Sequence, residues 1–170
     1  YKADLWNAFS DSEGIEVFVI YSERKNWAPD GGHNYLKWPE KRYENIVLEG
    51  KGILGKLRST IFVASRIFGS STEVIYIAGY ASLATLVAIL CATLIGKRFV
   101  MHTDEFNNQQ PEGKFVWLKV LYRTFIRKVV FTYSSAVLVC GKRGFESAIL
   151  AGCSEYKLLE FPYVVDVKRI

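Results

Sequence analysis

The chain has 170 residues, half of them hydrophobic and 15% aromatic, which is enough apolar material for one domain with a substantial core. The net charge of +5 favours an anionic partner such as a nucleotide, a nucleic acid or an acidic membrane surface. The three cysteines, Cys91, Cys140 and Cys153, are odd in number and lie in apolar or small-residue settings, so we expect reduced core thiols of an intracellular protein and not a disulfide framework. The sequence shows neither metal-ligand spacing nor a signal peptide.

The N-terminal part predicts a helix over residues 2–13, a strong strand over 15–21 and a short strand over 45–49. Between these strands, residues 22–44 are polar and aromatic. That segment could stack on a sugar, lie on a lipid interface, or form a loop held by its own aromatic rings. A helix is predicted over residues 53–68, with an inward apolar stripe of Ile53, Leu57, Ile61, Ala64 and Phe68.

Residues 74–106 form the centre of the predicted fold. The β-branched and aromatic run 74–78 predicts a buried strand, and Gly79 permits a turn after it. Ser82 is a suitable N-cap for an apolar helix to residue 95, which Gly96 would end. A second strand begins at Lys97 and leads to a polar cluster at 102–105. A strand–helix–strand unit of this size predicts two parallel strands with a right-handed crossover.

The same stretch has a membrane interpretation. Residues 74–95 carry no charge and are about long enough to cross a bilayer. Gly79 and Ser82 interrupt the run, however, and its first part is typical of a strand. We therefore favour a buried helix of a covered parallel sheet, with a membrane span or an interfacial segment as alternatives.

The C-terminal part begins with a predicted long amphipathic helix over residues 114–133. Lys119, Arg123 and Arg127 recur at a spacing of four and form a basic stripe on it. No acidic residue occurs from 113 to 145, so this stripe is either a solvated face or a surface for an anionic partner. The apolar residues expected on the opposite side of the helix are Phe115, Leu118, Tyr122, Phe125, Ile126 and Val129.

After that helix we expect a strand at 136–140, a short helix at 143–151 and a last strand at 157–161. The alternation of strands and helices predicts an α/β fold, a Rossmann-like, mainly parallel sheet with helices on both faces. Neither GxGxxG nor GxxxxGK[ST] is present, so a dinucleotide oxidoreductase or a P-loop enzyme loses its main signature. The chain begins with a helix before its first strand, which suggests that an earlier strand preceded Tyr1.

Three segments resemble the N-terminal domain of retaining GT-B glycosyltransferases of family 4. They are the closing FPYVVDVKRI, the preceding AVLVCGKRGFESAILAGCSEYKLLEF, and GYASLATLVAILCATLIGKRFVMHTDEF. The resemblance covers roughly residues 73–170. It implies that residues 1–170 are a single Rossmann-like, acceptor-side domain, the N-terminal half of a two-domain enzyme. The donor domain would follow in a longer chain, and the present piece alone would be inactive.

Candidate site residues lie at two predicted strand ends, where ligands bind in parallel sheets. His102 is the expected catalytic residue, because the resemblance places a histidine there near the acceptor and the transferred sugar; otherwise it is a histidine satisfied within a loop. Gly79 and Tyr80 would line the acceptor site, although Tyr80 could equally serve packing. Asp104 and Glu105 would orient an acceptor hydroxyl, or Asp104 would cap a turn.

The function predicted from the sequence is transfer of a sugar from a nucleotide-sugar donor to a glycan or lipid-linked acceptor in polysaccharide synthesis. The resemblance implies retention, with neither a metal nor a cofactor. The enzyme would be cytoplasmic or peripheral on the inner face of the membrane, with the basic stripe on anionic lipid. Nucleic acid is not expected, because no nucleic-acid-binding motif accompanies the charge. The alternative is a non-catalytic α/β module that docks on a membrane or a partner through the basic helix.

Overall fold

The computed structural model describes residues 2–21, 43–48, 52–80, 82–104, 106 and 115–161. Most of the polar and aromatic segment 22–44, the predicted site residue Glu105 and the closing phrase after residue 161 lie outside the described residues. The described residues divide into two compact units, one before Thr60 and one from Thr60 onward. Each unit is described by itself.

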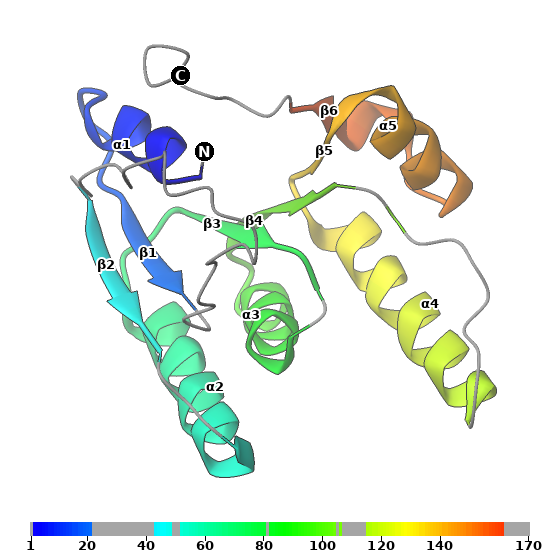
Figure 1. Cartoon of the computed structure of the whole chain (residues 1–170), viewed down its shortest axis with the longest axis horizontal. Coiled ribbons are helices and arrows are strands. Elements are labelled where there is room, and N and C mark those ends of the chain that lie inside the picture. The colour runs from blue at the N-terminus through cyan, green and yellow to red at the C-terminus, as the bar shows by residue number, and fades with distance from the viewer. Residues whose placement is uncertain are drawn as a thin grey trace, which may run out of the picture. The chain divides into compact units, whose positions relative to one another are not determined.

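The first unit contains α1 (Lys2–Ser10), β1 (Phe18–Tyr21), β2 (Glu44–Val47) and the start of α2 (Gly52–Gly69). The strands β1 and β2 pair in parallel over four residues each, with Phe18 opposite Glu44 and Tyr21 opposite Val47 (Figure 1). Both strands were predicted, although the first is shorter than the apolar run 15–21 suggests. The two strands form a sheet of their own.

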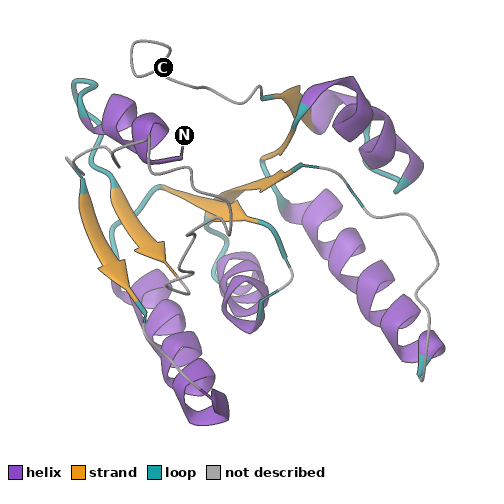
Figure 2. Cartoon of the chain, in the orientation of Figure 1, coloured by secondary structure: helices purple, strands orange, loops and turns teal. Residues whose placement is uncertain are grey.

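The second unit is a strand–helix repeat. Its strands are β3 (Val74–Ala78), β4 (Arg98–Thr103), β5 (Ala136–Val139) and β6 (Leu158–Glu160), and its helices are α3 (Leu83–Leu94), α4 (Val116–Tyr133) and α5 (Gly141–Leu150) (Figure 2). The sheet order is β3-β4-β5-β6, and all three pairings are parallel. The predicted α/β class with parallel strands is therefore confirmed. Because each crossover goes to the next strand in the same direction, the right-handed rule places α3, α4 and α5 on one face of this sheet.

The helix α3 begins and ends where the sequence predicts. Ser82 is its N-cap, and Ser82 and Thr85 form a capping box in which each side chain is hydrogen-bonded to the other residue's backbone N–H. At the other end, Gly96 has a φ of 69°, a left-handed value that favours glycine. These local signals fix α3 between its two parallel strands, as the predicted strand–helix–strand unit requires.

The two faces of the four-stranded sheet are covered to different extents. The register aligns Ile77, Met101 and Val137 across three strands, and all three side chains are at most 3% exposed. One residue further along each strand, Ala78, His102 and Leu138 align on the opposite face. Of these three only His102 is buried. One face therefore supplies the core, and the other carries the buried histidine among more accessible neighbours.

The predicted inward stripe of α2 is wrong. Ile53, Leu57, Ile61 and Phe68 are each at least 50% exposed, and Ala64 is only half-buried. The buried residues of α2 are instead Thr60, Val63 and Ile67. The helix presents two adjacent apolar stripes, and their hydrophobicity alone does not decide which one packs against the body.

The uncharged run 74–95, for which a membrane span was an alternative, forms β3 and α3. Among the described helices, none is both long enough and apolar enough to cross a bilayer. The apolar helix α3 buries Ala84, Ala88, Ile89, Cys91 and Ala92. Its end residues Leu83 and Leu94 remain 48% and 80% exposed, so α3 is a core helix along one face and not around its whole circumference.

A close approach at Gly144 holds α5 against the end of β4. A Cβ atom at this position would lie 2.5 Å from the backbone oxygen of Asp104 and 3.2 Å from Cβ of Val139. The first of these distances is far below van der Waals contact, and a backbone oxygen cannot rotate away. A side chain at 144 would therefore push α5 away from the strand ends.

We predict that Gly144→Ala lowers the free energy of unfolding by about 1–3 kcal/mol, the usual cost of overpacking a close contact. Urea unfolding followed by circular dichroism measures the change. Gly69→Ala is the matched control, because a Cβ there meets nothing within 4 Å. Equal stability of Gly144→Ala and wild type would contradict the tight packing of α5 on β4.

Candidate functional site

The carboxyl ends of β3, β4 and β5 lie side by side, as parallel pairing requires. Gly79 follows β3 with a φ of 72°, and its backbone N–H donates a hydrogen bond to the carbonyl of His102 at 2.8 Å. This bond continues the β3–β4 ladder by one residue beyond Ala78. The predicted site residues Gly79 and His102 are thus brought together by the backbone itself.

The His102 imidazole is almost completely buried, with 3% of its surface exposed. Its Nδ1 is hydrogen-bonded to the Tyr76 hydroxyl on the neighbouring strand, and its Nε2 lies 3.5 Å from Sγ of Cys140. The Phe161 ring meets the imidazole edge-on, with 5.5 Å between centroids. These contacts fix the position of the ring, so any chemistry at His102 involves Nε2 and the Cys140 side of the ring.

Cys140 and Asp104 complete a cluster at this edge. Cys140 follows β5 directly and is partly exposed, while Asp104 follows β4 and is exposed. The Cys140 thiol donates a weak hydrogen bond to Oδ1 of Asp104, with 3.6 Å between sulfur and oxygen. One donor atom from each of His102, Asp104 and Cys140 lies within 4.8 Å of the others. The cluster offers an imidazole, a thiol and a carboxylate at a single strand edge.

Aromatic packing connects Tyr80 with α4. The Tyr80 ring is stacked on Phe106, with centroids 5.9 Å apart and 20° between the ring planes. Phe106 is 2% exposed and meets Phe131 edge-on, and the Arg127 guanidinium lies 5.7 Å from the Phe106 centroid. Tyr80 therefore packs within the second unit. Packing is one of its two predicted roles, and lining the acceptor site is the other.

The N-terminal half of α4 carries an exposed apolar surface. Ile126, Val129 and Val130 are buried in its second half, whereas the large apolar side chains of its first half are each 36–67% exposed. Figure 1 shows that this end of α4 extends away from β4 and β5. The exposed residues are Phe115, Val116, Trp117, Leu118, Val120, Leu121, Tyr122 and Phe125.

Of the residues predicted opposite the basic stripe, Ile126 and Val129 are buried, whereas Phe115, Leu118, Tyr122 and Phe125 are exposed. At 100° per residue this apolar side lies next to the basic stripe and not opposite to it, which corrects the prediction. The basic stripe is also uneven: Lys119 is exposed, whereas Arg123 and Arg127 are half-buried. Arg127 belongs to the aromatic packing on Phe106, which leaves Lys119 and Arg123 beside the exposed apolar surface.

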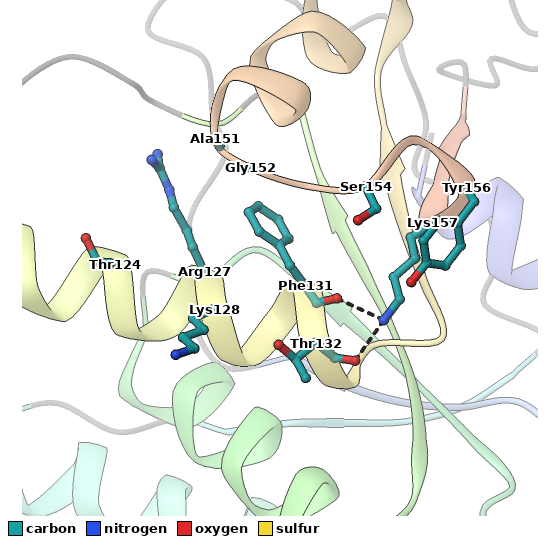
Figure 3. Close-up of a pocket in the computed structure, with 10 residues that line it drawn as sticks. All are labelled: Thr124, Arg127, Lys128, Phe131, Thr132, Ala151, Gly152, Ser154, Tyr156 and Lys157. Atoms are coloured by element: carbon teal, nitrogen blue, oxygen red, sulfur yellow. Dashed lines mark hydrogen bonds between the residues drawn. The ribbon is translucent and has the colours of Figure 1, made fainter.

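A pocket of about 550 Å³ lies between the second half of α4 and the turn after α5 (Figure 3). Of the predicted site residues, its lining includes only Arg127. Lys157 occupies one end, where its Nζ donates to the carbonyls of Phe131 and Thr132 at 2.8 Å and of Ser134 at 3.0 Å. The ammonium thereby caps the C-terminal end of α4, so its role there is structural.

The structure brings together Gly79, His102 and Asp104 from the predicted site, while Glu105 lies outside the described residues. Tyr76 and Cys140 are neighbours of His102 that the sequence does not reveal. The sequence predicts Tyr76 only as a strand residue and Cys140 only as a core thiol. The available signal was that Cys140 immediately follows a strand parallel to the one that contains His102 near its end.

No protein-family model matches the chain, and no curated protein sequence matches it.

We predict that iodoacetamide at pH 8 modifies Cys140 before Cys91 and Cys153. Burial raises the pKa of the Cys91 thiol, and burial also raises the pKa of Cys153 more than the neighbouring Lys157 lowers it. Both thiols are therefore mostly protonated and shielded at this pH, whereas Cys140 is partly exposed. Peptide mass spectrometry over time measures the order.

The control is the same labelling in denaturant, where the three cysteines should react at similar rates. Faster modification of Cys91 or Cys153 in the folded protein would contradict the burial pattern.

Proposed function

We propose that this chain is the acceptor-side domain of a GT-B glycosyltransferase similar to family 4. The whole enzyme would transfer a sugar from a nucleotide-sugar to a glycan or lipid-linked acceptor, with retention of configuration. The observation that carries the proposal is the convergence of Gly79, His102 and Asp104 at the carboxyl ends of parallel strands, where α/β folds bind ligands.

Each residue of the site has a chemical role in this proposal. Asp104 is exposed, so its carboxylate can accept a hydrogen bond from an acceptor hydroxyl. The left-handed turn at Gly79 keeps the strand end open, because a Cβ atom is absent there. His102, held by Tyr76, places Nε2 toward the same edge. Stabilisation of the departing nucleotide phosphate would come from a second domain.

Peripheral membrane docking is the second part of the proposal. The exposed apolar surface of α4 lies beside Lys119 and Arg123, and the sequence carries no acidic residue from 113 to 145. Apolar area together with basic charge is the combination that holds a helix in the interface of an anionic bilayer. The same surface favours the second candidate function, a non-catalytic module that docks on a membrane.

We predict that Asp104→Asn weakens binding of a sugar acceptor by about 10-fold or more, since a hydrogen bond to a charged group contributes about 1.5–3 kcal/mol. Saturation-transfer NMR in the presence of EDTA, with monosaccharides, disaccharides and a short-chain prenyl-diphosphate sugar as probes, measures the binding. Glu155→Gln is the matched control, because Glu155 is also exposed and lies before β6, near the opposite end of the strands.

Two outcomes would overturn the transferase assignment. One is the absence of binding for every sugar probe, and the other is equal binding by Asp104→Asn and wild type. The 170-residue chain should also release no UDP or GDP from nucleotide-sugars, because the donor groups would lie in the second domain. Release of UDP or GDP by this chain alone would contradict the assignment of the donor-binding groups to a second domain.

For the membrane surface, we predict that Lys119→Glu combined with Arg123→Glu lowers vesicle binding by more than about 10-fold, since each basic residue near an anionic surface contributes about 1 kcal/mol. Flotation with vesicles containing phosphatidylglycerol measures the bound fraction. The control is Lys142→Glu with Arg143→Glu, which makes the same charge change on exposed residues of α5. Equal binding by the α4 variant and the wild type would remove the docking proposal.

A further inference from the structure

We propose that His102, Asp104 and Cys140 bind a zinc ion at the carboxyl edge of the sheet. Each residue contributes one ligand atom: an imidazole nitrogen, a carboxylate oxygen and a thiolate sulfur. Among the described residues, these three form a group whose ligand atoms all lie within 4.8 Å of one another. The inference goes beyond the proposed transferase and stands on the geometry of the cluster alone.

The two distances from the Cys140 sulfur to the other ligand atoms match a tetrahedral zinc site. Zinc binds sulfur at about 2.3 Å and nitrogen or oxygen at about 2.0–2.2 Å, so adjacent sulfur and nitrogen or oxygen ligands of a tetrahedron lie about 3.5 Å apart. In the structure, Sγ of Cys140 lies 3.5 Å from Nε2 of His102 and 3.6 Å from Oδ1 of Asp104. The spacing around the sulfur therefore suits an ion bound by Cys140 together with His102 and Asp104, whose ligand atoms lie within 4.8 Å of each other.

The surroundings of His102 are those of a metal ligand. The Tyr76 hydroxyl is hydrogen-bonded to Nδ1, and when Nδ1 carries the proton and donates it to this hydroxyl, the Nε2 lone pair faces Cys140. A hydrogen-bond acceptor on the second ring nitrogen orients a ligating histidine, and the hydroxyl oxygen of Tyr76 can serve as that acceptor. The hydrogen bond from Gly79 to the His102 carbonyl and the 3% exposure of the side chain fix the residue further.

Three protein ligands leave a fourth position of the tetrahedron open. Asp104 is exposed and Cys140 is partly exposed, so this position is accessible for water or for a ligand oxygen. The thiolate favours zinc over magnesium and calcium, which prefer oxygen ligands.

The sequence alone predicts no metal, because the ligands belong to two strand ends that lie far apart along the chain. Cys140 lies 38 residues after His102 and 36 residues after Asp104. Only the parallel pairing of β4 with β5 brings the two strand ends together. A search for ligands at short spacings cannot find such a site.

The test uses the 170-residue chain after treatment with a chelator and its removal. Titration with Co²⁺ should give one equivalent of tetrahedral cobalt with a sulfur-to-cobalt charge-transfer band, and Zn²⁺ should displace it. The band reports the thiolate ligand directly and requires no sugar. Because sugar binding is measured in EDTA, failure of the metal site and failure of the transferase proposal are distinguishable.

Three variants assign the ligands. Cys140→Ser should remove the charge-transfer band, whereas the matched control Cys91→Ala, a thiol of α3, should retain it. Asp104→Asn should keep the band but lower Co²⁺ affinity by more than about 10-fold. Tyr76→Phe removes only the hydroxyl on His102 and should lower affinity by about 10–100-fold, the range for partners of ligating histidines.

The absence of a charge-transfer band in wild type would overturn the proposal, as would a band that persists in Cys140→Ser. Unchanged Co²⁺ affinity in Asp104→Asn would exclude the three-ligand arrangement. If Cys140→Ser does not fold, as judged by circular dichroism, Asp104→Asn decides the question because its side chain is exposed.

Discussion

The parallel register of β3, β4 and β5 is the constraint on which the second unit depends. It places Ala78, His102 and Leu138 in one row across the sheet and leaves the next residues of each strand at a common edge. A slip of one residue would turn His102 to the core face and separate it from Tyr76 and Cys140. The cluster at the edge is therefore a consequence of strand pairing, together with the first residues that follow β4 and β5.

The core face of the same sheet maintains this register. Phe99, Met101, Val137 and Val139 have no exposed surface, and the cost of moving any of them into water favours a single alignment. Gly144 then lets α5 approach the end of β4 closely enough for the Ser147 hydroxyl to accept a hydrogen bond from the backbone of Phe106 at 2.9 Å. Apolar packing on one face thus positions the polar residues at the edge and on the opposite face.

The sequence predicted the helices and strands well, because the residues that start and end each element lie within or next to it. Ser82 and Gly96 carry the start and the end of α3 in their own backbone preferences, and the run 74–78 is a strand as expected. The sequence could not predict how much of each helix is covered by the other elements of the fold. The apolar residues at the expected helical spacing on α2 and in the first half of α4 are nevertheless largely exposed. The pairing of Cys140 with His102 was hidden for a related reason, since it is set by strand order and not by spacing along the chain.

The Lys157 cap makes the end of α4 depend on a residue that is synthesised later. The carbonyls that it binds lie 23 to 26 residues earlier, at the end of α4, and the lysine itself directly precedes β6. During synthesis α4 therefore emerges before the residue that completes its C-terminal end. Its last turn gains this partner only when β6 pairs with β5, so the closing strand and the helix that carries the exposed apolar surface are expected to become stable in the same step.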